Sequence, residues 1–292
     1  GQYQGNAAAD NDKLWRSAEK GTNKDWTALH WEAYQRPPQT DPVQMFGAHP
    51  HYHLPEPQPR QSLLRNLSDT INQVHGAKWL IKRILPAQAT GIMFGQPGTG
   101  KSFVAIDLSA SVASGTMFNL NKAKCGNVVY IAGEGHAAIS NRFKARLLND
   151  TTGAAERIHV SARSIALTDQ TDVQNLVNEI DLLSAKPSLI VIDTLFRATA
   201  GSDVNDHSDM SKFWQTVDNL KNRYGCTVLI VHHSGRNEIS RSFGSMVLLA
   251  NADFEIAVTS DESGMKSIEN TKQKDAEEFA PLHFKLDQID IG

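Results

Sequence analysis

The stretch Gly95-Gln-Pro-Gly-Thr-Gly-Lys101-Ser102 decides the fold of this chain, because it fits the phosphate-binding pattern G-x-x-x-x-G-K-[ST] at every fixed position. The apolar run 90–94 before it is typical of a buried strand, and residues 103–112 after it carry apolar side chains at helical spacing. A strand, a glycine loop and a helix in this order are the context that the pattern requires. The sequence therefore predicts a phosphate-binding loop that opens a helix.

The loop predicts a site for ATP and Mg²⁺. Its glycines allow backbone N–H groups to turn toward a triphosphate, and the helix N-terminus adds a partial positive charge. Lys101 is expected to reach the β- and γ-phosphates, and the Ser102 hydroxyl is expected to ligate Mg²⁺. The residues predicted to bind the nucleotide are Gly95, Gln96, Pro97, Gly98, Thr99, Gly100, Lys101, Ser102 and Phe103.

Composition limits the remaining function classes. The chain has 292 residues, of which 40% are hydrophobic and 21% charged, which allows one large domain or a domain with an extension. The net charge of −3 gives no overall nucleic-acid signal, so any DNA contact must come from local basic patches. Neither a membrane span nor a signal peptide is recognisable, and we expect a cytoplasmic protein without a membrane partner. Because the first residue is Gly rather than Met, we expect a processed or excised piece of a longer chain.

Two regions of different character are predicted, an N-terminal extension and linker at residues 1–60 and an ATPase domain at residues 61–292. The extension is rich in proline between residues 36 and 60, which favours extended backbone. The second region alternates strand-like and helical patterns, which predicts an α/β fold with a mainly parallel sheet covered on both faces. The predicted strands are 127–132, 158–160, 189–192, 227–231 and 254–258, and the predicted helices are 62–74, 137–148, 172–183 and 208–224.

Two predicted strands end in a carboxylate. Asp193 ends the apolar run 189–193 and is expected to hold Mg²⁺, directly or through water. Glu134 follows another strand and has two interpretations: a general base for the water that attacks the γ-phosphate, or an acidic residue at the start of the next helix. We favour the first, because the carboxyl ends of parallel strands meet at the edge that carries Lys101.

A third strand ends in His232 and His233. Since side chains alternate along a strand, only one of them should face the nucleotide, and we expect His233 to sense the γ-phosphate. A histidine satisfied within the core is the alternative for either residue. Beyond it, Arg236 and Arg241 lie in a polar loop and are predicted to contact a DNA backbone.

Lys272 and Lys274 are spaced by one residue in a late strand or hairpin, so both should point to the same side. They are candidates for a cationic finger that reaches the γ-phosphate bound by a neighbouring subunit. A solvated pair of charges that protects an edge strand is the alternative. The residues alone do not decide between the two.

Together these segments resemble the RecA-like ATPases, and within them the RepA-type and DnaB-type hexameric replicative helicases. The resemblance covers roughly residues 75–292 and rests on GQPGTGKS, VVYIAGEGH, LIVIDTL, VLIVHHSGR with the downstream RSFGS, and NTKQKD. It implies that Glu134 is the catalytic base and that the γ-phosphate sensor falls on His233. The trans-acting K-x-R element falls on Lys272 and Lys274, where this chain has Lys in place of Arg, and a lysine lacks the bidentate fork of an arginine.

The N-terminal pieces LWRSAEKG and LHWEAYQR resemble the end of a primase-associated domain found in phage and plasmid primase-helicase fusions. The resemblances imply an ATP-dependent DNA helicase or translocase on single-stranded DNA that assembles into a ring, expected to be a hexamer, with a primase domain or replication proteins as partners. The alternatives are a RecA-like recombinase or annealing ATPase and a non-DNA oligomeric regulatory ATPase.

Overall fold

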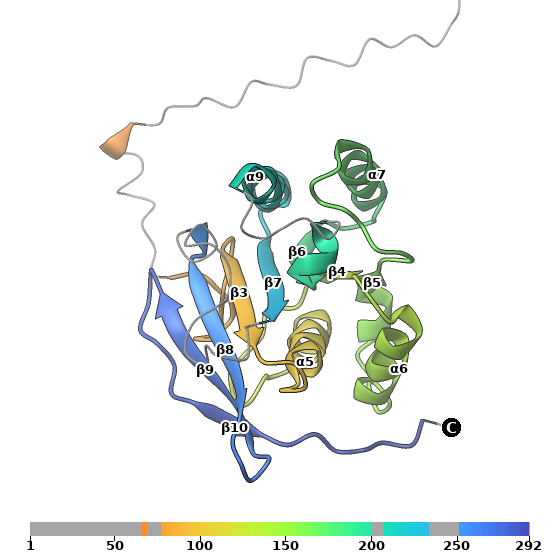
Figure 1. Cartoon of the computed structure of the whole chain (residues 1–292), viewed down its shortest axis with the longest axis vertical. Helices are drawn as coiled ribbons and strands as arrows, with labels where there is room; N and C mark the ends of the chain where they lie inside the picture. The colour runs from red at the N-terminus through yellow and green to blue at the C-terminus, as the bar shows by residue number, and fades with distance from the viewer. Residues whose placement is uncertain (1–65, 69–76, 200–206, 234–250, 292) are drawn as a thin grey trace, which may run out of the picture. The chain divides into compact units, whose positions relative to one another are not determined.

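The computed structural model describes residues 66–68, 77–199, 207–233 and 251–291 (Figure 1). Residues from Gln73 to the C-terminus belong to one unit, which contains the whole sheet. The predicted extension at 1–60 and most of the predicted helix 62–74 lie outside the described residues, as do Arg236 and Arg241. The boundary between residues 60 and 61 stays a prediction.

An eight-stranded sheet forms the centre of the unit, in the order β10-β9-β8-β3-β7-β6-β4-β5. The six strands from β8 to β5 pair in parallel, while β9 is antiparallel to β8 and β10 to β9. This confirms the predicted α/β fold with a mainly parallel sheet. The strands are β3 (Thr90–Gly95), β4 (Asn127–Ala132), β5 (Ile158–Val160), β6 (Pro187–Asp193), β7 (Thr227–His233), β8 (Phe254–Ser260), β9 (Lys266–Gln273) and β10 (Leu282–Phe284).

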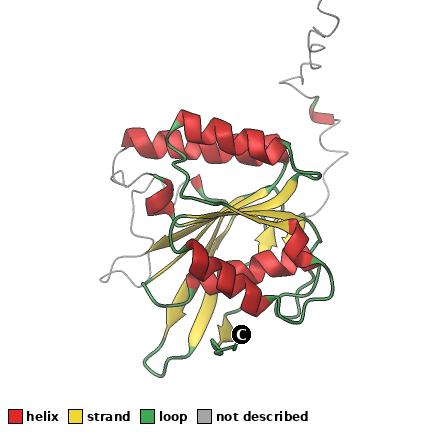
Figure 2. Ribbon diagram, turned by 90° about the vertical axis from the view of Figure 1, so that its right-hand side faces the viewer, coloured by secondary structure: helices red, strands yellow, loops and turns green. Residues whose placement is uncertain are grey.

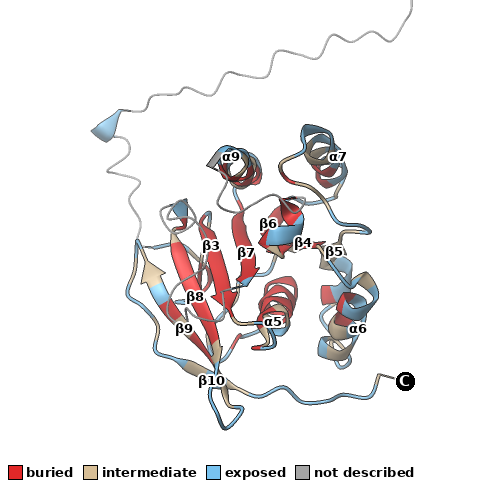
Figure 3. Cartoon of the chain, in the orientation of Figure 1, coloured by how far each residue is buried: buried red, intermediate tan, exposed pale blue. Residues whose placement is uncertain are grey.

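Helices cover both faces of this sheet (Figures 1 and 2). Helices α5 (Lys101–Ser114) and α6 (His136–Arg146) pack on one face. Helices α7 (Gln170–Asp181), α8 (Leu195–Ala198) and α9 (His207–Tyr224) pack on the other. A short 3-10 helix, η1 (Ala154–Arg157), precedes β5. A sheet buried on both faces requires strands that are apolar throughout, and the central strands are buried along nearly their whole length (Figure 3).

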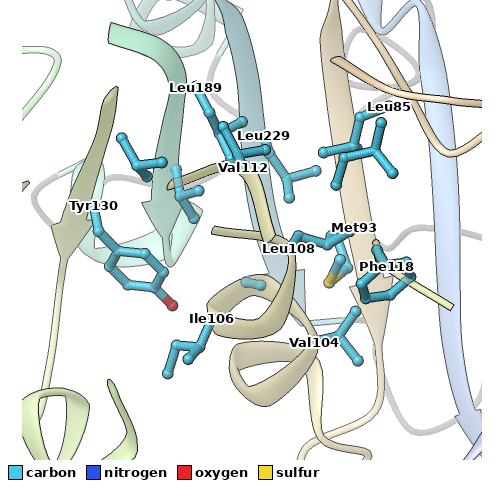
Figure 4. Close-up of a cluster of buried hydrophobic side chains, with 14 of the residues drawn as sticks. Leu85, Met93, Val104, Ile106, Leu108, Val112, Phe118, Tyr130, Leu189 and Leu229 are labelled. Atoms are coloured by element: carbon cyan, nitrogen blue, oxygen red, sulfur yellow. The ribbon is translucent and has the colours of Figure 1, made fainter. Parts of the chain in front are cut away.

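The alternation of side chains along each strand divides the core into two clusters. On β6, Leu189 and Val191 lie in the cluster beneath α5, some of whose members Figure 4 shows, whereas Ile190 and Ile192 lie in the cluster beneath α9. The alternation continues to the strand ends. It therefore fixes which polar residues at the carboxyl edge face the helix that follows the phosphate-binding loop.

One element was not predicted from the sequence. The chain before β3 forms a separate two-stranded sheet of β1 (Trp79–Ile81) and β2 (Leu85–Pro86). Arg83, in the turn between the two strands, has a positive φ of 65°, so the chain reverses there before it enters β3. No described helix is long and apolar enough to span a membrane.

Candidate nucleotide-binding site

The predicted phosphate-binding loop joins β3 to α5. Strand β3 ends at Gly95 and helix α5 begins at Lys101. Gly100, at the N-cap, has a φ of 101°, a conformation that favours glycine. A Cβ on Gly95 would clash with the backbone oxygen of Val258 on β8, so the loop leaves the sheet by a close approach that only glycine permits. The local sequence thus shapes a tight loop at the N-terminus of a 14-residue helix.

Lys101 lies inside this loop and is only 4% exposed. Its Nζ donates hydrogen bonds to the carbonyl oxygens of Gly95, at 2.9 Å, and Gln96, at 2.7 Å. Burial lowers the pKa of Lys101 from 10.5 to about 8, and the nearby charge of Asp193 opposes this shift. A charged ammonium is therefore held in the loop at neutral pH, in the position where the motif needs a phosphate ligand.

Asp193 lies at the end of β6 and is buried. Side chains two residues apart on a strand point to the same face, so Asp193 shares the α5 face of the sheet with Leu189 and Val191. Tyr130, which is fully buried on the neighbouring strand β4, donates a hydrogen bond from its hydroxyl to Asp193 Oδ2 at 2.6 Å. Burial and the adjacent carboxylate raise the pKa of Tyr130 well above its ordinary value, so the hydroxyl keeps its proton.

His233 and His232 take opposite faces of β7, as alternation predicts. Their neighbours Val231 and Ile230 belong to the clusters beneath α5 and α9 respectively, so His233 lies on the α5 face and His232 is buried on the other. His233 pairs across the sheet with Gly95, the first residue of the loop. Desolvation lowers the pKa of His233, and the charge of Lys101 lowers it further, which favours the neutral ring.

Glu134 follows β4 and makes an ion pair with Arg197 of α8, with 2.6 Å between Oε1 and Nε. Helix α6 has Gly135 as its N-cap and no acidic residue in its first turn. Glu134 therefore does not serve as a first-turn acid of that helix. Its side chain is 63% exposed and open to solvent at the carboxyl edge of the sheet.

The oxygen atoms at this edge fit a magnesium ion that is shared with a nucleotide. Ser102 lies in the first turn of α5, and Asp193 supplies a buried carboxylate on the same face. In the part of the chain that the structure describes, no group of three or more His, Cys, Asp or Glu residues forms a metal site from protein alone. Mg²⁺ commonly takes one or two protein oxygens and completes its shell with phosphate and water. Ser102 and Asp193 match that requirement.

Lys272 and Lys274 lie far from this edge. Strand β8 runs parallel to β3, and Lys272 pairs with Glu255 near the beginning of β8. Lys272 Nζ lies 3.9 Å from a carboxylate oxygen of Glu255, and Lys274 Nζ lies 3.0 Å from one of Asp253. Both lysines thus lie at the end of the sheet opposite to their own phosphate-binding loop, and each is beside a carboxylate.

Three residues near the site were not found from the sequence: Tyr130, Arg197 and Lys266. Lys266 begins β9, and its Nζ donates to the carbonyl oxygen of Gly98 at 3.2 Å, beside a cavity of about 360 Å³ along the loop. Each of the three contacts joins segments that are distant in sequence. Only the order of strands in the sheet brings them together, and no local pattern signals it.

The fold and the site define a P-loop nucleotide-binding protein: a glycine loop with a buried lysine, and a carboxylate at the end of a strand beside it. A family model described as an AAA domain matches residues 55–238, which is more than half of the chain. The chain therefore belongs to this AAA domain family, and the match indicates a P-loop ATPase. No curated protein matches the chain significantly. Strands β8 to β10 lie beyond the matched residues.

Proposed function

We propose that this P-loop ATPase is a ring-forming helicase or translocase that uses ATP hydrolysis to move along single-stranded DNA in replication. The observation that carries the proposal is the grouping of Lys101, Asp193 and His233 on one face of the sheet, with Glu134 at the same edge. A motor needs a site that both hydrolyses ATP and senses the loss of the γ-phosphate, and this grouping supplies residues suited to both tasks.

Each of these residues has a role suited to its chemistry. The Lys101 ammonium exchanges two loop carbonyls for the β- and γ-phosphates when the nucleotide binds. Ser102 and Asp193 would hold the magnesium ion, which would neutralise charge on the phosphates. Glu134 accepts a proton from the attacking water. His233, neutral because its pKa is lowered, donates a hydrogen bond to the γ-phosphate and loses that contact after hydrolysis.

Movement on DNA is assigned to the segment that follows His233. Arg236 and Arg241 stand only three and eight residues beyond the sensor in the sequence. A change at the end of β7 is therefore passed directly into a segment with two guanidinium groups. Guanidinium groups bind phosphate in a bidentate manner, which suits contact with the DNA backbone.

The position of Lys272 and Lys274 supports the proposal of a ring. Since they lie at the edge opposite to their own loop, they can contribute to catalysis only at the site of another subunit. Their pairing with Glu255 and Asp253 keeps the two ammonium groups at that distant edge. We propose that a neighbouring subunit, in a ring expected to be a hexamer, presents its nucleotide there.

A subunit-mixing experiment tests this arrangement. One variant, Lys101→Ala, has a defective loop and intact fingers, and the other, Lys272→Ala with Lys274→Ala, has an intact loop and no fingers. Each alone should lose ATPase activity and the unwinding of a forked DNA duplex, and a mixture should regain part of the ATPase activity. Retention of activity by the Lys101→Ala variant would contradict the proposed motor, and a mixture that stays inactive would contradict the shared site.

A non-DNA regulatory ATPase is the second candidate, because the net charge of −3 gives little general affinity for nucleic acid. It would use the same nucleotide site and the same subunit contact as an assembly switch. Binding of fluorescent single-stranded DNA at low salt separates the two candidates. No binding with ATP present would favour the regulator.

A further inference from the structure

The hydrogen bond between Tyr130 and Asp193 has no part in the roles assigned so far. We propose that Tyr130 is a positioning residue for the magnesium site, in which its hydroxyl fixes the Asp193 carboxylate for the metal. The proposal rests on the metal role of Asp193 given above. It adds a residue from a third element, strand β4, to a magnesium site otherwise built from helix α5 and strand β6.

The surroundings of Tyr130 are apolar and tightly packed. The side chain is fully buried in the cluster beneath α5, and its ring meets that of Phe143 edge-to-face, with centroids 5.3 Å apart. Figure 4 shows the ring with its oxygen directed away from the strand, on the side of Ile106. Burying a hydroxyl in apolar surroundings destabilises the fold unless the hydroxyl makes a hydrogen bond, and Asp193 accepts one from Tyr130.

The hydrogen bond restricts the orientation of the Asp193 carboxylate. Asp193 is 6% exposed, and its carboxylate accepts a hydrogen bond from the Tyr130 hydroxyl. The bond uses Oδ2 and holds the plane of the carboxylate, which leaves acceptor capacity at Oδ1 for a metal or its water. Carboxylates that ligate metals are commonly oriented by such outer hydrogen bonds.

The register of the sheet makes this contact possible. Ala132 pairs with Asp193 across β4 and β6, and Tyr130 lies two residues earlier on the same face. A long side chain can reach a diagonal neighbour at that spacing. The same strand leads to Glu134, so one strand fixes the metal carboxylate and carries the proposed base.

Replacement of Tyr130 by phenylalanine tests the proposal, because it removes the hydroxyl and keeps the ring in the core. Tyr224→Phe is the matched control: the Tyr224 hydroxyl donates to Asp181 at 3.1 Å, and this tyrosine packs in the other cluster, beneath α9. Binding of a fluorescent, non-hydrolysable ATP analogue is measured against Mg²⁺ concentration, and again in excess EDTA. Thermal unfolding of each variant is followed in parallel.

We expect Tyr130→Phe to raise the Mg²⁺ concentration at half-saturation by about 10- to 100-fold, with binding in EDTA equal to the wild type. Tyr224→Phe should leave both measurements unchanged. An unchanged Mg²⁺ dependence in Tyr130→Phe would overturn the proposal. So would an equal loss of binding with and without Mg²⁺, because a merely structural role would produce it. The assay contains no DNA, so a failure of the helicase proposal would appear in unwinding and leave this result unaffected.

Discussion

Replacement of Lys101 by methionine is expected to stabilise the nucleotide-free protein while it abolishes nucleotide binding. The ammonium is 4% exposed and is solvated by the carbonyl groups of Gly95 and Gln96 in place of water. Its pKa of about 8, against 10.5 for a free lysine, measures how poorly this loop tolerates the charge. Methionine has a similar length and no charge, so the variant avoids this cost.

The magnitude follows from the pKa. A gap of about 2.5 pKa units at about 1.4 kcal/mol per unit corresponds to about 3 kcal/mol of destabilisation at neutral pH, where Lys101 is charged in both the folded and the unfolded protein. In the variant the carbonyl groups of Gly95 and Gln96 lose their hydrogen-bond donor, and this loss offsets about 1 kcal/mol of the expected stabilisation. A net gain of about 2 kcal/mol in the free energy of unfolding remains, and this raises the melting temperature by about 4–8 °C.

The pH dependence gives an independent check on the same group. Between pH 8 and 10.5 the folded protein has released the Lys101 proton while the unfolded chain still holds it. Unfolding then takes up a proton, so the free energy of unfolding of the wild type rises with pH across this window. The methionine variant lacks the group and should lack this rise.

Urea unfolding at pH 7 and pH 9.5, with fluorescent-nucleotide binding beside it, measures both effects. Lys212→Met is the control, because Lys212 is 59% exposed on α9 and forms a surface pair with Asp209 of little energetic weight. A Lys101→Met variant that is less stable than the wild type, or that keeps the wild-type slope between the two pH values, would refute the reasoning about the buried ammonium.

Three further predictions concern the base, the packing of the loop strand and the sensor. Glu134→Gln should lower ATPase turnover by about 10²- to 10⁴-fold with nucleotide affinity retained, and a turnover near that of the wild type would exclude Glu134 as the base. Gly91→Ala should cost about 1–3 kcal/mol in urea unfolding, since a Cβ there would overlap the buried ring of Phe254, and equal stability would contradict the close packing of β3 on β8. The pKa of His233 is lowered from 6.5 in the folded protein, so the unfolded chain takes up the proton first and the free energy of unfolding should decrease as pH falls through 6.5. His233→Gln should reduce this decrease. A pH dependence identical to that of the wild type would contradict the lowered pKa.

Local patterns in the sequence were sufficient for the parts of the fold and site that depend on neighbours along the chain. The glycine loop, the helix after it and the carboxylate at the end of β6 were all predicted from spacing and periodicity. Alternation also selected His233 over His232, and the structure places His233 opposite Gly95. These features succeed because one strand or one loop contains the whole signal.

The features that were missed depend on which strands become neighbours. Tyr130 meets Asp193 because β4 lies beside β6, and Lys266 meets Gly98 because the hairpin of β8 and β9 returns to the loop. No residue spacing encodes either contact. The separate sheet of β1 and β2 was missed for a similar reason, because the reversal at Arg83 uses a positive φ at a residue that seldom signals a turn.

The rate of ATP hydrolysis with and without single-stranded DNA tests the central claim most directly. The claim joins the nucleotide site at the carboxyl edge of the sheet to a DNA-contacting segment beyond His233. It predicts a low rate without DNA, a strong stimulation by single-stranded DNA, and no hydrolysis by Lys101→Ala under either condition. A healthy rate that single-stranded DNA leaves unchanged would contradict a DNA motor and favour the regulatory ATPase.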